Sequence, residues 1–292
     1  MPASRYWELA LATPEAVADP LVNFLWEHRA LGVVEAPAAH ARTFLRAFFP
    51  PDTDVAGLEA DIGTYLASLA RLGLRMRGRP RLTPLADRNW GEAWREHFRP
   101  IRVGRRLIVL PPWERQVAMG GRIALVVEPG RAFGTGHHGS TASCLMRLES
   151  AARSRPARAI DVGTGSGILA IAALKLGVGR VLAVDEDPDA VTAARGNAAR
   201  NGVASAMRCV LGDAARMRPR RAPLVLANLL SALHLKLAPH YARLVSPNGA
   251  LLLGGILNSE ERGIQSALES QGFVHAGQSR DDGWSCLEMR RR

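Results

Sequence analysis

The chain has 292 residues, 47% of them apolar, so it is long enough for a substantial core and more than one domain. It has no apolar run of about 18 residues and no signal-peptide pattern at its N-terminus, so we predict no membrane span and no membrane partner. The three cysteines, Cys144, Cys209 and Cys286, include no close pair. This predicts a reduced, cytoplasmic protein without a structural zinc site.

The formal net charge of +11 is unevenly distributed along the chain. Residues 1–70 hold four basic and nine acidic side chains, a net charge of −5, so residues 71–292 carry +16. This change of sign indicates two domains with different partners. An acidic front domain would attract a basic molecule. The basic remainder would contact nucleic acid, or would simply be a solvated, arginine-rich surface.

The first 83 residues have the pattern of a small α+β domain. The expected strands are residues 5–12, 33–36, 42–49 and 74–85, and the expected helices are residues 15–31 and 55–73. The order β-α-β-β-α-β is typical of a ferredoxin-like split βαβ arrangement. We predict that residues 1–83 form a ferredoxin-like substrate-recognition domain.

Residues 84–100 are predicted to form a connector helix. Trp90, Trp94 and Phe98 are spaced four residues apart and would share one face of that helix. The face would be buried against a neighbouring domain, or would serve as a lid or a partner contact.

Residues 101–292 alternate between strand and helix patterns, which predicts a doubly wound, seven-stranded, Rossmann-like sheet. The expected strands are residues 105–110, 122–128, 158–163, 180–187, 206–213, 222–229, 249–257, 273–280 and 284–290. The expected helices are residues 142–152, 167–177, 188–202, 232–245 and 260–272. The last two strands would form an antiparallel hairpin around residues 281–283.

A glycine-rich loop with a carboxylate before it follows the strand at 158–163. The dinucleotide fingerprint G-x-G-x-x-G would need glycine where Ile168 stands, and Asp161 would repel a pyrophosphate but attract a sulfonium or ammonium group. Asp185 ends the next strand, where a carboxylate can accept hydrogen bonds from ribose hydroxyls. We therefore predict S-adenosylmethionine as the cofactor, bound by Asp161, Gly163, Gly165 and Asp185. Helix capping is the alternative role for both carboxylates.

Several stretches between residues 90 and 240 together resemble the ribosomal protein L-eleven methyltransferase family (PrmA-like). They are "WGEAWREHFRPIRVGRRLIVLPPW", "EPGRAFGTGHHGST", "DVGTGSGILAIAALKLG", "VDEDPDAV…N…NG" and "LANLLSALHLKLAP". The resemblance implies methylation of amino groups on a large-subunit ribosomal protein. It also implies that Thr141 contacts the cofactor, that Gly163 lies under it, that Asp185 holds the ribose and that Asn228 closes the far side.

The chain departs from the family pattern at two places. The family usually reads Thr-His-Pro-Thr-Thr where this chain reads His137-His138-Gly139-Ser140-Thr141, and Cys where it has Thr164. Glycine in place of proline should loosen the loop before the cofactor binds. No third metal ligand lies near the two histidines, so we predict no metal site, a loop-shaping role for His138 and an exposed His137.

Methyl transfer to an amine requires the neutral amine, and an unperturbed lysine pKa near 10.4 leaves about one lysine in a few thousand neutral at pH 7. An apolar pocket and the positive charge of the cofactor would lower that pKa, so a strong protein base is optional. Asn228, at a strand end, would accept a hydrogen bond from the amine and aim its lone pair. Its alternative roles are a strand-end cap or a cofactor contact alone.

We therefore predict a monomeric, S-adenosylmethionine-dependent protein N-methyltransferase. It would modify lysine side chains and/or the N-terminal amine of a basic ribosomal protein, free or on the large subunit, and its basic body would contact ribosomal RNA. A methyltransferase of nucleic acid or a small molecule is the first alternative, although Asn228 precedes Leu-Leu rather than Pro-Pro-aromatic. A non-catalytic binding module is the second, and the intact glycines and carboxylates argue against it.

Overall fold

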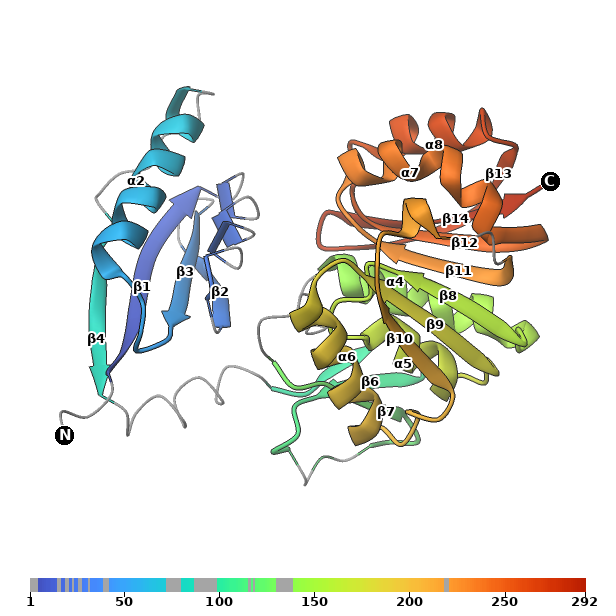
Figure 1. The fold of residues 1–292 in the computed structure, drawn as a ribbon, viewed down its shortest axis with the longest axis horizontal. Coiled ribbons are helices and arrows are strands. Elements are labelled where there is room, and N and C mark those ends of the chain that lie inside the picture. The colour runs from blue at the N-terminus through green and yellow to red at the C-terminus, as the bar shows by residue number, and fades with distance from the viewer. Residues whose placement is uncertain are drawn as a thin grey trace. The chain divides into compact units, whose positions relative to one another are not determined.

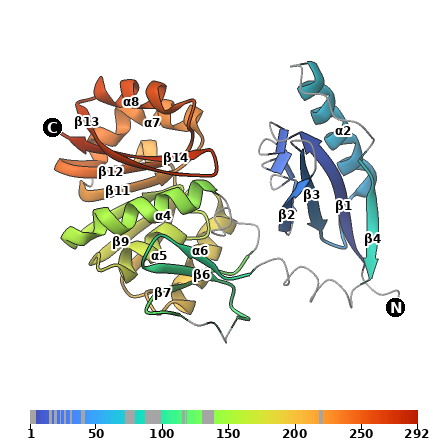
Figure 2. The ribbon, with the colours of Figure 1, turned by 180° about the vertical axis from the view of Figure 1, so that it is seen from behind.

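In the computed structural model of the chain, Met1–Arg99 and Pro100–Arg292 form two compact units. Figures 1 and 2 show the ribbon from opposite sides. The structure describes residues 5–14, 17–18, 21–22, 24–25, 28–30, 32–38, 42–71, 80–86, 99–114, 117, 119–129, 139–217 and 221–292. None of the helices in these ranges is long and apolar enough to cross a membrane.

The first unit is built on a four-stranded sheet in the order β2-β3-β1-β4. Its elements are β1 (Arg5–Pro14), β2 (Gly32–Ala38), β3 (Arg42–Phe49), α2 (Val55–Arg71) and β4 (Leu82–Ala86), and all strand pairs are antiparallel. Residues 17–18, 21–22 and 24–25 are helical as well, so the predicted β-α-β-β-α-β order is confirmed. Leu9 and Phe49 of the sheet pack with Leu25 and Ile62 of the helices in one core.

The end of the front domain differs from the prediction. Residues 84 and 85 are predicted both as the end of the strand 74–85 and as the start of the connector helix. They belong with Ala86 to β4 and pair with β1, with Pro84 opposite Trp7. β1 is thereby paired on both sides, and Pro84 is tolerated because β4 is an edge strand. Residues 87–98, which include the three predicted aromatic positions, lie outside the described residues, so the connector helix stays a prediction.

The second unit contains a seven-stranded sheet in the order β10-β9-β8-β11-β12-β14-β13. The strands are β8 (Arg158–Val162), β9 (Arg180–Asp185), β10 (Met207–Leu211), β11 (Ala222–Asn228), β12 (Val245–Leu257), β13 (Phe273–Asp281) and β14 (Trp284–Arg291). The neighbouring strands β10, β9, β8, β11 and β12 are parallel to one another, whereas β14 runs antiparallel to both β12 and β13. The predicted doubly wound sheet and its terminal hairpin are confirmed.

Helices cover both faces of this sheet (Figure 1). They are α4 (Gly139–Ala151), α5 (Ile168–Lys175), α6 (Pro188–Arg200), α7 (Ser231–Leu244) and α8 (Glu261–Glu269), with short 3-10 turns at Ala152–Ser154 and Ala214–Arg216. Successive residues of β11 alternate between the two cores: Leu224 and Leu226 pack on the side of α4 to α6, and Val225 and Ala227 on the side of α7 and α8. The strand order reverses between β8 and β11, and doubly wound sheets bind ligands at the carboxyl ends of strands beside such a reversal.

A three-stranded sheet of β5 (Ile101–Val103), β6 (Leu107–Leu110) and β7 (Ile123–Val126) precedes α4. The sequence pattern predicts β6 and β7 but not β5, which is too short for a periodic signal. A tertiary contact stabilises the turn between β5 and β6. The Glu149 carboxylate of α4 accepts hydrogen bonds there from the backbone N–H groups of Arg105 (3.2 Å) and Arg106 (2.8 Å).

Candidate active site

The glycine loop leaves β8 and turns over the end of β9. The backbone N–H groups of Gly163 and Thr164 both donate to the Val184 carbonyl, at 2.9 and 3.0 Å. Gly163 has φ +66°, and a Cβ there would lie 2.4 Å from Cδ2 of Leu229. Glycine is therefore required both by the left-handed backbone and by the close approach of the segment after β11.

Asp185 at the end of β9 holds this loop in place. One carboxylate oxygen accepts the Gly165 N–H at 2.8 Å, and the other accepts the Asp187 N–H at 3.0 Å. The N-cap of α6 is instead Asp187, whose side chain accepts from the Asp189 N–H, and the N-cap of α5 is Gly167. The alternative that Asp161 and Asp185 serve as helix caps is therefore wrong.

Asp161 is almost completely buried, with 1% of its surface exposed. Its Oδ2 accepts a hydrogen bond of 2.6 Å from the Thr164 hydroxyl, which gives a structural role to the threonine that departs from the family pattern. Burial raises the pKa of Asp161 to about 7, against the opposing effect of hydrogen bonds from Thr164 and the Ala170 backbone. The carboxyl group is thus poised to change its charge near neutral pH.

Asn228, the last residue of β11, lies beside the start of α4. Its Nδ2 is 3.4 Å from the hydroxyl oxygen of Thr141, which is fully buried. Its Oδ1 is buried and has no hydrogen-bond partner among the described residues. A buried acceptor without a donor is destabilising in a protein interior, and a bound ligand would satisfy it.

Asn197 of α6 and Asn201, the C-cap residue of α6, connect the segment at residues 126–128 to the glycine loop. The side chain of Asn197 donates to the Ser166 carbonyl at 2.9 Å and accepts the Glu128 N–H at 3.0 Å. Asn201 exchanges hydrogen bonds with both backbone groups of Val126. The buried amide of Asn197 therefore joins the start of the stretch EPGRAFGTGHHGST to the glycine loop. Sequence reasoning assigned no role to these residues, although both asparagines stand in the family-like stretch.

His234 of α7 fixes the backbone beside Asn228. Its Nε2 lies 2.7 Å from the Gly254 carbonyl and its Nδ1 lies 2.9 Å from the Tyr241 hydroxyl. A carbonyl only accepts, so Nε2 carries the proton and Nδ1 accepts from Tyr241. Burial lowers the pKa of His234 to about 4, so the ring is neutral at pH 7. The same carbonyl accepts the Leu229 N–H at 3.1 Å, which positions the residue after Asn228. The sequence pattern did not single out this histidine.

Gly139, at the departure from the family pattern, is the first residue of α4. A Cβ at this position would lie 2.8 Å from the Asp281 carbonyl and 3.1 Å from Cδ1 of Trp284. A larger residue would therefore collide with the turn between β13 and β14. His137 and His138 lie outside the described residues, and within the described ranges no group of His, Cys, Asp and Glu is placed to hold a metal ion.

The third glycine of the loop is Gly167, one residue before the position that the dinucleotide fingerprint requires, and the carboxylate of Asp161 lies at the end of β8. These two features distinguish the ligand site at the reversal of strand order between β8 and β11, the switch point of the sheet, from a dinucleotide site. Together with the strand order, they define the class of S-adenosylmethionine-dependent methyltransferases, in which that cofactor is the methyl donor.

Comparison with known proteins narrows the class. The family model described as ribosomal protein L11 methyltransferase (PrmA) matches residues 5–292. The ribosomal protein L11 methyltransferases of Geobacter sulfurreducens and Symbiobacterium thermophilum are 37% and 34% identical to the chain, over 98% and 97% of it and 98% of each relative. The crystal structure of a ribosomal protein L11 methylase from Lactobacillus delbrueckii subsp. bulgaricus matches with a TM-score of 0.61 and 31% identity, over 67% of this chain and 100% of that one. The chain belongs to the ribosomal protein L11 methyltransferase family, so the predicted family is confirmed.

Proposed function

We propose that the protein transfers the methyl group of S-adenosylmethionine to lysine side chains and/or the N-terminal amine of ribosomal protein L11. The observation that carries this proposal is the buried, unpartnered Oδ1 of Asn228 at the switch point of the sheet. An acceptor in this position suits an N–H donor such as an amine. The names of the relatives support the choice of the protein substrate.

The residues at the switch point fit the cofactor. Each carboxylate oxygen of Asp185 accepts one hydrogen bond from a backbone N–H group. A carboxylate has about four lone-pair sites, so Asp185 can still accept hydrogen bonds from ribose hydroxyls. Asp161 would favour a cationic ligand once it is ionised. We propose that the cofactor is held by Thr141, Asp161, Gly163, Gly165, Asp185 and Asn228. When bound, it supplies an electrophilic methyl group on a sulfonium.

The chain itself then has to orient a neutral amine. The Oδ1 of Asn228 accepts one N–H of the amine and directs its lone pair toward the reacting carbon, which makes alignment the main contribution of the protein. Leu229 and Leu230 follow Asn228 directly, Leu233 lies in the first turn of α7, and Leu230 and Leu233 are exposed. An apolar surface of this kind desolvates the amine and lowers its pKa, so that a strong base is not needed.

The remaining roles are also proposals. The acidic front domain, predicted as residues 1–83, would recognise the basic substrate, and the protein would act as a cytoplasmic monomer that also contacts ribosomal RNA. Asp52 and Asp61 are both exposed on this unit. If the front domain binds the substrate through its negative charge, the double variant Asp52→Asn/Asp61→Asn should raise KM for L11 and leave kcat unchanged. An unchanged KM would move substrate recognition to another surface.

The central test compares methyl incorporation into purified L11 by the wild type and Asn228→Ala, with mass spectrometry of the modified peptides. We expect kcat for Asn228→Ala to fall at least about tenfold, because the amine loses its alignment. The exposed amide change Gln278→Ala should leave kcat unchanged and serves as the matched control. Methylation of RNA or of a small amine in place of L11 would overturn the proposed substrate.

A further inference from the structure

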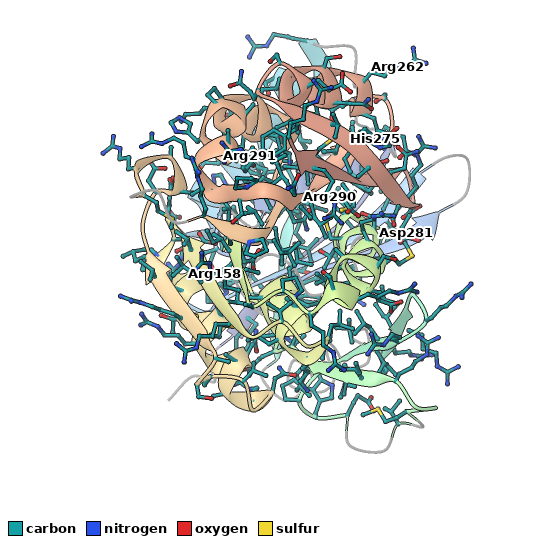
Figure 3. All side chains as sticks on the ribbon, turned by 90° about the vertical axis from the view of Figure 1, so that its right-hand side faces the viewer. Arg158, Arg262, His275, Asp281, Arg290 and Arg291 are labelled. Atoms are coloured by element: carbon teal, nitrogen blue, oxygen red, sulfur yellow. The ribbon has the colours of Figure 1, made fainter. Side chains whose placement is uncertain are left out.

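The end of the sheet opposite the candidate active site is lined by arginines. The segments that enter strands there, residues 152–157, 176–179, 201–206, 221 and 270–272, contain no Asp or Glu. Arginines stand within them or at the adjoining strand ends, and we call this set the arginine edge: Arg153, Arg155, Arg158, Arg180, Arg221 and residues 290–292. Figure 3 views these strand ends and labels Arg158, Arg290 and Arg291. The charged side chains of these segments are therefore all basic, while the exposed Glu269 of α8 directly precedes residue 270.

Some guanidinium groups of the arginine edge donate hydrogen bonds to backbone carbonyl groups. Arg158 donates to the Arg221 carbonyl at 3.0 Å, and Arg291 donates to the Val245 carbonyl at 2.7 Å. Only Arg290 has a carboxylate partner among the described residues, the buried Glu288, and Glu288 also pairs with Arg147. The described residues therefore leave most of the positive charge of this surface without a neutralising carboxylate.

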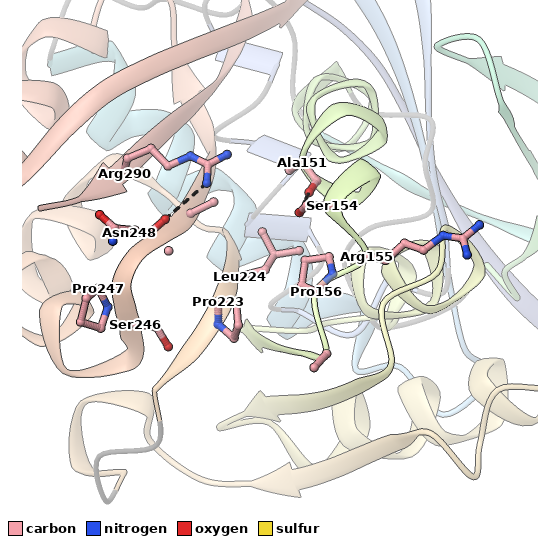
Figure 4. Close-up of a pocket in the computed structure, with 13 residues that line it drawn as sticks. Ala151, Ser154, Arg155, Pro156, Pro223, Leu224, Ser246, Pro247, Asn248 and Arg290 are labelled. Atoms are coloured by element: carbon pink, nitrogen blue, oxygen red, sulfur yellow. Dashed lines mark hydrogen bonds between the residues drawn. The ribbon is translucent and has the colours of Figure 1, made fainter.

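A hollow of about 400 Å³ opens in the middle of the arginine edge (Figure 4). It is lined by the turn before β8, the start of β12 and Arg290 of β14, whose guanidinium reaches toward the Asn248 carbonyl at 3.4 Å. Arg155 and Asn248, both in its wall, have the left-handed backbone angles φ +46° and +60°. Left-handed angles are common at helix C-caps and for asparagine in turns, so two tight turns form this part of the wall.

We propose that the arginine edge binds the sugar–phosphate backbone of RNA. Guanidinium groups bind phosphate oxygens in a bidentate fashion, and a surface with one sign of charge attracts a polyanion and orients its approach. The hollow would receive a phosphate or a ribose beside the guanidinium of Arg290, whereas the Arg155 side chain points away from it (Figure 4). Backbone contacts of this kind position a nucleic acid without reading its sequence. That the RNA is ribosomal rests on the proposed function, whereas the binding surface itself does not.

The test uses the full chain and a short fluorescein-labelled RNA hairpin, with fluorescence anisotropy at several salt concentrations. The test variant changes Arg153, Arg180 and Arg221 to Gln. The matched control changes Arg195, Arg216 and Arg262 to Gln. These arginines are exposed and stand on α6, on the turn after β10 and at the start of α8, outside the segments of the arginine edge. Both variants lose the same formal charge. Thermal unfolding and titration with S-adenosylmethionine establish that both are folded and able to bind the cofactor.

We expect the slope of log K against log salt to fall in magnitude by about 2 to 3 in the test variant, since each phosphate contact contributes about 0.7 to 0.9. The control should keep the wild-type slope, and methylation of free L11 should be the same in all three proteins. Equal losses in test and control, or no RNA binding by the wild type at low salt, would overturn the proposal. Loss of L11 methylation in the test variant alone would instead mark the surface as a protein-binding site. Because L11 methylation is measured separately, failure of this proposal is distinguishable from failure of the proposed function.

Discussion

The carboxyl edge and the amino edge of the seven-stranded sheet carry opposite charge, although the same strands end at both. The segments that leave strands at the carboxyl edge, residues 163–167, 186–187, 212–213, 229–230, 258–260 and 282–283, contain Glu186, Asp187, Asp213, Glu260 and Asp282 and no Lys or Arg. The amino edge is the arginine edge. A net charge of +11 therefore describes neither surface. The sequence indicated an acidic front and a basic body, whereas the fold divides the body itself, with the acidic part beside the cofactor residues.

The two edges should differ most in the free energy of unfolding that is lost when a glycine with positive φ is changed to alanine. Gly255 at the carboxyl edge has φ +73°, and a Cβ there would lie 2.3 Å from the Leu229 carbonyl oxygen. Gly202 at the amino edge has φ +70° with nothing within 4 Å of its Cβ position. Gly202→Ala should cost about 1 to 2 kcal/mol from the backbone conformation alone, and Gly255→Ala about 3 kcal/mol or more, because the collision adds to it. Urea unfolding measures both, and equal losses would contradict the tight packing at the carboxyl edge.

The second prediction concerns His234, which has no counterpart at the amino edge. Its pKa is about 4 in the folded chain and about 6.5 when unfolded. Between these values the unfolded chain binds more protons, so the contribution of His234 to the free energy of unfolding falls by about 3 kcal/mol as the pH drops from 6.5 to 4. His234→Gln should lose this dependence, whereas His275→Gln, at an exposed position, should keep it. Asp161 contributes equally to both variants, so the difference between their pH profiles isolates His234, and coincident profiles would refute its buried, neutral state.

The third prediction separates two neighbouring carboxylates of the carboxyl edge. Asp185→Ala should weaken the binding of S-adenosylmethionine by roughly 2–3 kcal/mol, because charge-assisted hydrogen bonds are lost. Asp187→Ala should reduce stability by about 1 kcal/mol through loss of the α6 cap and leave cofactor affinity unchanged. Isothermal titration on the folded variants measures both affinities. An unaltered affinity in Asp185→Ala would move the ribose site elsewhere.

The smallest effect is expected from the ionisation of Asp161. The positive charge of S-adenosylmethionine favours the carboxylate, and the pKa of Asp161 in the free protein is about 7, so binding at lower pH must release a proton. Affinity should therefore rise by up to about tenfold, or roughly 1.4 kcal/mol, from pH 6 to pH 8. Asp161→Asn should flatten this rise, and S-adenosylhomocysteine, which lacks the sulfonium charge, should show a smaller one. A pH profile that Asp161→Asn leaves intact would assign the proton to another group.

Much of the fold follows from local patterns, because β8 to β14 and the helices between them have clear apolar patterns. Many of their ends adjoin glycine, proline or aspartate, as at Gly163, Asp185 and Gly283. The strand-end positions of Asp161 and Asp185 were predictable for the same reason. The failures have a common cause in tertiary contact. Strand β5 depends on the distant Glu149, and Asn197 stands on a helix whose pattern does not reveal that the segment after β7 covers it. His234 likewise gains its role only when β12 brings the Gly254 carbonyl within reach.

The bond between Asn201 and β7 has a consequence for the chemical ageing of the protein. Asn201 precedes Gly202, and in a flexible chain the glycine nitrogen of such a pair readily attacks the asparagine amide to form a succinimide, which hydrolyses to aspartate or isoaspartate. In the folded chain the Gly202 N–H donates to the Ala199 carbonyl, and the Asn201 amide is held by Val126 and the Asn197 carbonyl. Both reacting groups are therefore engaged elsewhere. Isoaspartate at position 201 would accumulate only while the chain is unfolded or β7 is detached, so its amount in an aged sample would record the time spent in those states.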